Sequence, residues 1–125
     1  MSERKILVLD DDENVRLLIE FGLKKMGFAV DFALAGSEAV SLYRTAFADN
    51  NKYLAAILDL NIPGEMGGVE ASRQILSLDP DAMLFISSGN DYDPVMANYR
   101  DHGFAGKVTK PFLYAEFVES LKVLL

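Results

Sequence analysis

The sequence predicts an α/β domain with a doubly wound, five-stranded parallel sheet. Short apolar segments recur at regular intervals, segments with helical periodicity lie between them, and the central apolar segments do not alternate with polar residues. Strict alternation of strands and helices is typical of parallel strands joined by right-handed crossovers, with helices on both faces of the sheet. We expect one domain over residues 1–125, without an output domain, because this length suits a single core.

The expected strands are apolar segments that are too short to be ordinary helices. They cover residues 6–9, 29–33, 54–58, 83–86 and, more weakly, 104–108. Three of them, ILVL, LAAIL and MLFI, are apolar throughout. Continuous apolar strands indicate a sheet that is covered on both faces.

The first two expected helices are amphipathic. The first ends at Gly27 and the second begins at Ser37, and in both the apolar residues recur three and four positions apart. This spacing predicts one buried face on each helix. The buried faces consist of Val15, Leu18, Ile19, Gly22, Leu23 and Met26 in the first helix and of Ala39, Val40, Tyr43 and Phe47 in the second.

Three more helices follow. One runs from Val69 to Leu78, and another has Asp93 as its N-cap, Pro94 at its first position and Gly103 past its end. The last runs from about Leu113 to the C-terminus. The chain therefore contains five strand-helix pairs in sequence.

Composition excludes several classes of function. The chain has 12 basic and 19 acidic residues, a net charge of −7, which argues against direct binding to nucleic-acid phosphates. It has no cysteine, which excludes disulfides, thiolate metal sites and a cysteine nucleophile. No apolar run is long enough for a membrane span or a signal peptide. We expect a cytoplasmic protein that does not enter membranes.

Four acidic residues stand directly after the first strand. Asp10, Asp11, Asp12 and Glu13 follow Leu9, and like charges this close repel each other and lose hydration if they are buried. Asp12 and Glu13 suit the first turn of the following helix, where the helix dipole favours acids. Asp10 and Asp11 need another explanation, and a bound cation would supply it.

Other polar residues follow the remaining strands. Asp59 follows the third strand, Ser88 and Gly89 the fourth, and Lys110 the fifth. In a parallel sheet these residues meet at one edge, where α/β proteins bind ligands. Carboxylate oxygens suit Mg²⁺, a hydroxyl and an ammonium group suit phosphoryl oxygens, and a carboxylate can form an aspartyl phosphate.

These residues, in this order, resemble the receiver domain of two-component response regulators. The motifs are the acidic pair in ILVLDDDE, the aspartate in ILDLNIPG, the serine in FISSGND and the lysine in VTKPF. The resemblance covers essentially the whole chain and is greatest to the C-terminal receivers of hybrid sensor histidine kinases. It implies a flavodoxin-like sheet with strand order 2-1-3-4-5.

The resemblance also implies a role for each site residue. Asp59 would accept a phosphoryl group from a phosphohistidine on a sensor histidine kinase or a histidine phosphotransfer protein. Asp10, Asp11, Asp59 and the backbone carbonyl of Asn61 would hold Mg²⁺. Ser88 and Lys110 would each contact a phosphoryl oxygen, and the Lys110–Pro111 bond would be cis. The resemblance implies that such a domain catalyses only its own phosphorylation and its own slow dephosphorylation. It also implies either a monomer or a dimer that forms on phosphorylation.

Two features depart from the family pattern. Lys107 stands where the family usually has an aromatic residue that changes rotamer on activation, so the usual aromatic switch is not expected here. The turn NIPGEMGG after Asp59 is one residue longer than the common pattern. Lys107 also favours an alternative, namely a receiver-like interaction domain that works without phosphorylation.

Two other functions fit the sequence less well. A phosphatase that uses an aspartyl phosphate typically needs a second aspartate two positions after the nucleophile, and Asn61 stands there. A flavin-binding module needs a loop of hydroxyl and amide donors after the first strand, and the aspartates there would repel the flavin phosphate.

Overall fold

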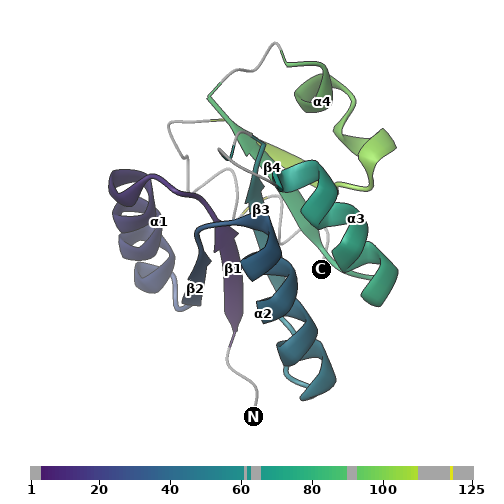
Figure 1. Cartoon of the computed structure of the whole chain (residues 1–125). Coiled ribbons are helices and arrows are strands. Elements are labelled where there is room, and N and C mark those ends of the chain that lie inside the picture. Colours follow the sequence, from purple (N-terminus) through teal and green to yellow (C-terminus); the bar gives the residue numbers. More distant parts are fainter. Residues whose placement is uncertain (1–3, 61, 63–65, 90–92, 110–118, 120–125) are drawn as a thin grey trace.

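The computed structural model describes residues 4–60, 62, 66–89, 93–109 and 119. A parallel five-stranded sheet forms its centre (Figure 1), with the strand order β2-β1-β3-β4-β5. This order confirms the predicted doubly wound, flavodoxin-like sheet. The strands are β1 (Lys5–Leu9), β2 (Ala29–Ala33), β3 (Ala55–Asp59), β4 (Leu84–Ser88) and β5 (Gly106–Thr109).

Helices cover both faces of this sheet. In Figure 1, α2 and α3 lie on one side of the strands and α1 lies on the other. A short α4 and a 3-10 helix, η1, precede β5. The helices of the described residues are α1 (Glu13–Lys25), α2 (Gly36–Ala48), α3 (Gly68–Leu78), α4 (Pro94–Ala97) and η1 (Tyr99–His102).

Strand β1 explains why the apolar segments of the sequence do not alternate. Leu7 and Leu9 belong to the apolar cluster under α2 and α3, while Ile6 and Val8 belong to the cluster under α1. Successive side chains of a strand point to opposite faces. Because both faces are covered, every residue of the strand except its first is fully buried.

The acidic residues after β1 begin the first helix in the predicted way. The Asp12 carboxylate accepts the backbone N–H groups of Asn14 and Val15, at 2.9 and 3.3 Å, and so caps α1. Glu13 lies in the first turn, where the helix dipole favours an acid. The helix ends at Lys25. Gly27 follows the C-cap residue Met26 and has a φ of +89°, which suits glycine.

The buried face of α1 is narrower than predicted. Ile19, Gly22 and Leu23 are buried, but Leu18 is 62% exposed and Met26 is 42% exposed. Leu18 lies about 100° around the helix axis from Ile19, at the margin of the buried face. Met26 is the C-cap residue and lies beyond the last helical turn.

The prediction that Phe47 is buried was wrong. Ala39, Val40 and Tyr43 of α2 are buried as predicted, but Phe47 is 40% exposed. The ring of Tyr53, from the loop after the helix, packs at 5.9 Å from the Tyr43 ring and is itself 2% exposed. An aromatic residue from outside the helix therefore occupies part of the core beside α2.

The fourth predicted helix is divided in two. Asp93 caps it through the N–H of Val95, with Pro94 at the first position, and it ends at Gly103, which has a φ of +87°. The α-helix stops at Ala97, however, and continues as the 3-10 helix η1. Met96 is the one buried residue of these two short helices, so little apolar burial favours a continuous α-helix.

Several predicted features lie outside the described residues. They include Asn61, Lys110, the Lys110–Pro111 bond and the final helix from Leu113, of which Glu119 alone is described, as helical. Among the described helices, none combines the length and the apolar composition that crossing a membrane requires.

A buried polar cluster joins α2 to the end of α3. Asp79 is 3% exposed, and its Oδ2 accepts hydrogen bonds of 2.7 Å from both the Tyr43 hydroxyl and Lys52 Nζ. The N–H of Asp81 donates to Oδ1 at 3.1 Å. Burial by itself would raise the pKa of Asp79. The hydrogen bonds from Lys52, Tyr43 and Asp81 have the larger, opposite effect, so the pKa lies below its usual value.

We expect Asp79→Asn to lower the free energy of unfolding by about 2–4 kcal/mol, because the buried cluster loses its charge and one acceptor. The lowered pKa means that Asp79 stabilises the fold fully above its unfolded pKa of 3.8, and that this contribution is lost as the pH falls through the folded value. Urea denaturation from neutral to acidic pH measures both effects.

Asp81→Asn is the matched control, because the Asp81 side chain is exposed and its backbone N–H remains. We expect it to keep both the stability and the acid dependence of the wild type. If the free energy of unfolding of Asp79→Asn falls with decreasing pH as much as that of the wild type, the role given to Asp79 is contradicted.

Candidate functional site at the carboxyl edge of the sheet

Strands β1 and β3 bring three carboxylates together where they end. Asp10 directly follows β1, and Asp59 is the last residue of β3. One oxygen atom from each of Asp10, Asp11 and Asp59 lies within 4.8 Å of the other two. Asp10 and Asp59 are 2% and 3% exposed, and Asp11 is exposed. The acidic residues that the sequence placed at this edge therefore form one cluster.

Asp10 is held by contacts to three parts of the chain. Its N–H donates to the carbonyl of Ala33 at 3.1 Å, which continues the pairing of β1 with β2. Its Oδ1 accepts the N–H of Asp12 at 2.9 Å, and Arg16 Nη1 donates to its carbonyl at 3.2 Å. These bonds fix Asp10 at the carboxyl end of β1. The strand order reverses between β1 and β3, and ligands of doubly wound sheets usually bind at such a topological switch point.

Asp59 is held through its backbone. A Cβ atom at Gly68, the first residue of α3, would lie 2.6 Å from the carbonyl oxygen of Asp59. The close approach therefore needs glycine. On the other side, Leu60 donates its N–H to the carbonyl of Ser87 at 2.8 Å, so pairing with β4 continues past Asp59.

Ser88 lies at the same edge, one strand away. It is the last residue of β4 and is fully buried, whereas the sequence placed it just after the strand. Its neighbour Ser87 is aligned with Asp59 in the β3–β4 register. Gly89 follows, and a Cβ atom there would meet no described atom within 4 Å. Among the described residues, none therefore packs against that side of Gly89, next to Ser88.

The remaining predicted site residues fall just outside the described part of the chain. Lys110 directly follows β5, which ends at Thr109, and Asn61 lies two residues after Asp59. Lys107, which replaces the expected aromatic residue, is exposed on β5 opposite Ile86 of β4.

The carboxylate cluster has the chemistry of a site for a hard cation. Two of its members are buried, so their negative charges repel each other in a place where water can screen them little. A divalent cation would offset this repulsion, and an oxygen-only donor set suits Mg²⁺. Among the described residues, this cluster is therefore the one suited to a metal ion.

Two residues support the cluster in a way that the sequence pattern did not predict. Arg16 holds the Asp10 carbonyl, and Gly68 makes room for the Asp59 carbonyl. The role of Gly68 was weakly indicated by the sequence. Gly67 and Gly68 stand together at the start of a helix, where residues with side chains are usual.

Comparisons with known proteins agree on one family. The model of the response regulator receiver domain matches residues 6–122. The transcriptional regulatory protein PrrA of Mycobacterium tuberculosis is 33% identical over 126 residues, which cover all of this chain and 51% of PrrA. The chain thus spans about half the length of this relative.

Two solved structures are also similar. The response regulator TrrA of Thermotoga maritima, in complex with Mg²⁺ and BeF, is 29% identical with a TM-score of 0.79, and each chain is covered completely. The receiver domain of the sensor histidine kinase PA1611 of Pseudomonas aeruginosa, with a magnesium ion in its active-site cleft, has a TM-score of 0.83. At 22% identity, over 99% of this chain and 98% of that one, the latter comparison shows the fold alone.

We expect Asp10→Asn to raise the free energy of unfolding in the absence of Mg²⁺ by on the order of 1–2 kcal/mol, because it removes one of three clustered charges. The amide oxygen can still accept the N–H of Asp12. We expect Mg²⁺ to stabilise the wild type, because it would bind the folded cluster, and we expect Asp10→Asn to lose most of that stabilisation. Urea denaturation with EDTA and with saturating Mg²⁺ measures both.

Asp12→Asn is the matched control, because asparagine caps a helix about as well as aspartate and Asp12 lies outside the cluster. It should leave the effect of Mg²⁺ unchanged. If Asp10→Asn instead lowers stability without Mg²⁺, repulsion within the cluster is not the dominant effect.

Proposed function

This chain belongs to the response regulator receiver domain family, and from that premise we propose that it accepts a phosphoryl group on Asp59 from a phosphohistidine of a partner protein. The observation that carries the proposal is the set of three carboxylates within 4.8 Å of one another at the carboxyl edge of the sheet. Receiver domains interact with histidine kinases, and we propose a sensor histidine kinase or a histidine phosphotransfer protein as the phosphodonor.

The proposed reaction is an in-line transfer. A carboxylate oxygen of Asp59 attacks the phosphorus atom, a phosphorus–oxygen bond forms, and the phosphorus–nitrogen bond to the partner's histidine breaks. The bonding electrons stay with the imidazole nitrogen, which takes up a proton. Little other chemistry is needed, so the domain acts mainly by positioning and by neutralising charge.

Asp10, Asp11 and Asp59, with the backbone carbonyl of Asn61, would hold the metal ion. When bound, Mg²⁺ supplies positive charge beside the phosphoryl oxygens. Asp10 is well suited to this role because backbone hydrogen bonds fix it on both sides. Lys110, the residue directly after β5, would pair with another phosphoryl oxygen.

Ser88 would carry the signal away from the site. It lies at the end of β4, and Asp59 and Ser88 are one register position apart on neighbouring strands. A hydrogen bond from its hydroxyl to a phosphoryl oxygen would pull on the strand that leads to α4 and that pairs with β5. We propose the surface formed by α4, η1 and β5 as the output surface, with Lys107 exposed on it instead of an aromatic residue.

Helix α1 offers a docking surface for the phosphodonor. Leu17, Leu18 and Phe21 are 60%, 62% and 67% exposed, and α1 begins two residues after Asp11. Exposed apolar side chains that lie together are uncommon on the surface of a monomer. A donor protein that packs on them would bring its histidine to the carboxyl edge of the sheet.

We expect incubation with acetyl phosphate and Mg²⁺ to add one phosphoryl group to the chain, and Asp59→Asn to abolish the addition, because the amide is not a nucleophile. Intact-mass spectrometry measures the gain, and loss of the group in hydroxylamine identifies an acyl phosphate. EDTA should prevent the reaction.

Asp101→Asn is a matched control, because Asp101 is an exposed aspartate of η1 outside the carboxylate cluster. It should be phosphorylated like the wild type. No mass gain from acetyl phosphate or from a phosphorylated histidine kinase would refute the proposed transfer. It would favour a receiver-like interaction domain that works without phosphorylation.

We expect Ser88→Ala to remain a substrate for phosphorylation but to lose most of the conformational response, because the hydroxyl that would contact the phosphoryl group is absent. Amide NMR spectra before and after phosphorylation measure this. In the wild type, residues 94–109 should shift together. Equal shifts of these residues in Ser88→Ala would exclude Ser88 as the link between the site and the output surface.

A further inference from the structure

Strand β4 ends with two serines, and the proposed mechanism uses only the second of them. The first, Ser87, is 3% exposed and is aligned with Asp59 in the β3–β4 register. Neighbouring strands of a sheet lie about 4.8 Å apart. The N–H of Leu60 donates to the carbonyl of Ser87 at 2.8 Å, which holds the two strands together at this point. Ser87 is therefore fixed directly beside Asp59 in the sheet.

The side chains of Ser87 and Asp59 lie on the same face of the sheet. Two residues before them, Phe85 and Ile57 belong to the apolar cluster under α1. Side chains of a strand alternate between the two faces, so Ser87 and Asp59 lie on that face as well. Val108, which is aligned with Ser87 on β5, belongs to the same cluster. The Ser87 hydroxyl is thus next to the carboxylate that is proposed to accept the phosphoryl group.

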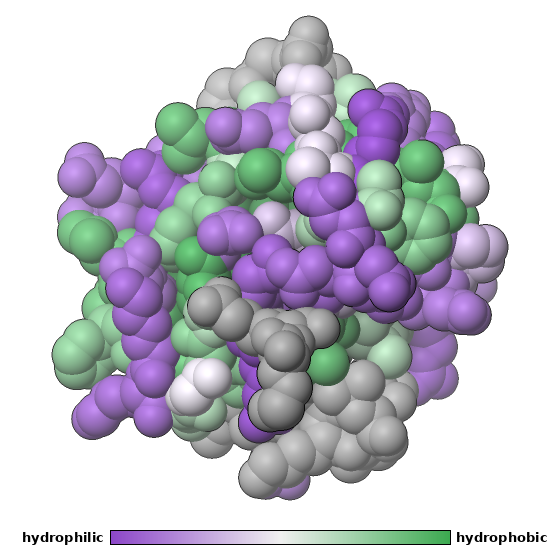
Figure 2. All heavy atoms as spheres, turned by 90° about the horizontal axis from the view of Figure 1, so that it is seen from below, coloured by the Kyte–Doolittle hydropathy of each residue, from purple (hydrophilic) through white to green (hydrophobic). Residues whose placement is uncertain are grey.

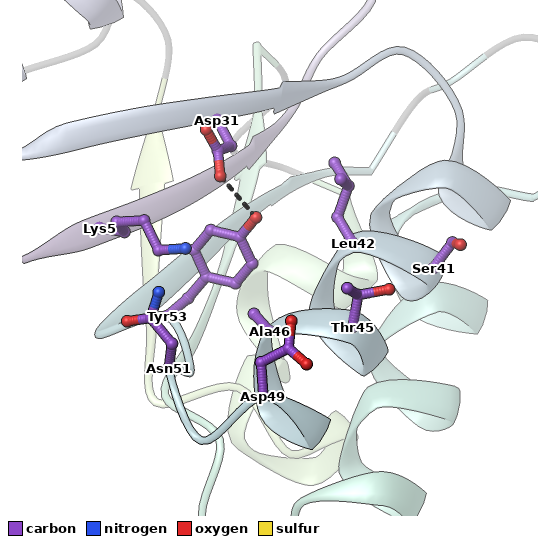
Figure 3. A pocket seen from close by; sticks show the side chains of 9 residues that line it. All are labelled: Lys5, Asp31, Ser41, Leu42, Thr45, Ala46, Asp49, Asn51 and Tyr53. Atoms are coloured by element: carbon purple, nitrogen blue, oxygen red, sulfur yellow. Dashed lines mark hydrogen bonds between the residues drawn. The ribbon is translucent and has the colours of Figure 1, made fainter. Parts of the chain in front are cut away.

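The Ser87 hydroxyl is buried, and within the part of the chain that the structure describes it has no hydrogen-bond partner. A buried hydroxyl without a partner is unfavourable, which favours an acceptor that is brought to it. Three other buried hydroxyl groups each donate a hydrogen bond of 2.6 or 2.7 Å, namely those of Tyr43 to Asp79, of Tyr53 to Asp31 (Figure 3) and of Ser72 to the carbonyl of Val69.

We propose that the Ser87 hydroxyl donates a hydrogen bond to the phosphoryl group on Asp59 and stabilises it during transfer. This inference rests on the proposed phosphorylation of Asp59. Phosphoryl oxygens are strong acceptors, and negative charge spreads over them in the transition state. A donor that is already held in place beside Asp59 stabilises this charge without reorganisation of the chain.

Ser87 and Ser88 have different tasks in this proposal because they lie on opposite faces. Ser88 follows Ile86, which belongs to the apolar cluster under α2 and α3. To reach a phosphoryl group on Asp59, the Ser88 side chain has to move with its strand, which suits a conformational signal. Ser87 needs no such movement, so its contribution is to the transfer itself.

The face of Ser87 is also the face on which the phosphodonor is proposed to dock. Leu17, Leu18 and Phe21 of α1 are more than half exposed. Helix α1 lies on the left in Figure 1, and Figure 2, turned about the horizontal axis, shows hydrophobic side chains at the surface on that side. A phosphoryl group that arrives from a donor on α1 would meet Ser87 on the same face of the sheet.

The test is the rate at which acetyl phosphate phosphorylates the full chain at saturating Mg²⁺, followed by intact-mass spectrometry. We expect Ser87→Ala to react about tenfold more slowly than the wild type, because it loses one hydrogen bond to a charged group. Ser87→Cys keeps the volume but is a weak donor, and it should be slow as well. Ser87→Thr keeps the hydroxyl and should retain most of the rate. The Mg²⁺ affinity of Ser87→Ala, from an amide NMR titration, should equal that of the wild type.

Thermal melts separate this role from a purely structural one. Because the hydroxyl has no described partner before phosphorylation, Ser87→Ala should melt at or above the wild-type temperature. A serine that only supports the fold would lose stability on the same substitution. Ser72→Ala is the matched control, since it removes a buried hydroxyl that is bonded within α3 and lies outside the carboxylate cluster. It should be phosphorylated at the wild-type rate.

The outcomes distinguish this inference from the proposed function. Equal rates for Ser87→Ala and the wild type would overturn the inference and leave the proposed function intact. A slow Ser87→Ala that has also lost stability or Mg²⁺ affinity would overturn it too, because the hydroxyl would then act through the fold or the metal site. If the wild type gains no phosphoryl group from acetyl phosphate or from a phosphorylated histidine kinase, the proposed function fails and this inference fails with it.

Discussion

The repulsion among Asp10, Asp11 and Asp59 is the constraint on which much of the structure depends. Mutual repulsion favours separation of these three carboxylates, and contacts from several elements of the fold keep them together. Strand β1 is paired on both sides, Arg16 and the N–H of Asp12 hold Asp10, and α3 begins against the backbone of Asp59. Burial of the large apolar clusters on both faces of the sheet stabilises the fold and offsets the unfavourable free energy of this repulsion.

Much of this could be predicted from the sequence, because the strongest signals are local. Apolar runs identified all five strands to within about two residues, and the turn and cap residues Gly27, Asp93, Pro94 and Gly103 marked helix ends correctly. The acidic cluster was predictable as well, since a parallel sheet brings the carboxyl ends of its strands to one edge. Residue type and position along the chain were sufficient for these features.

Features that depend on contacts distant in the sequence could not be predicted in this way. Phe47 has the spacing of a core residue, but Tyr53 lies beside Tyr43 in the core. The pairing of Asp79 with Tyr43 and Lys52 joins residues 36 and 27 positions apart. The division of the fourth helix into α4 and η1 reflects how little of it is buried, which periodicity over nine residues does not reveal.

The four-residue length of α4 has a consequence for how much work a signal must do. Met96 is its one buried side chain, and Val95 packs against the core while only partly buried, so we expect the free energy that separates its folded form from a locally opened one to be small compared with that of the whole domain. A single new hydrogen bond at the end of β4 supplies only on the order of 1 kcal/mol. A surface element with shallow local stability can change its populations in response to an input of that size, whereas a long, well-packed helix could not.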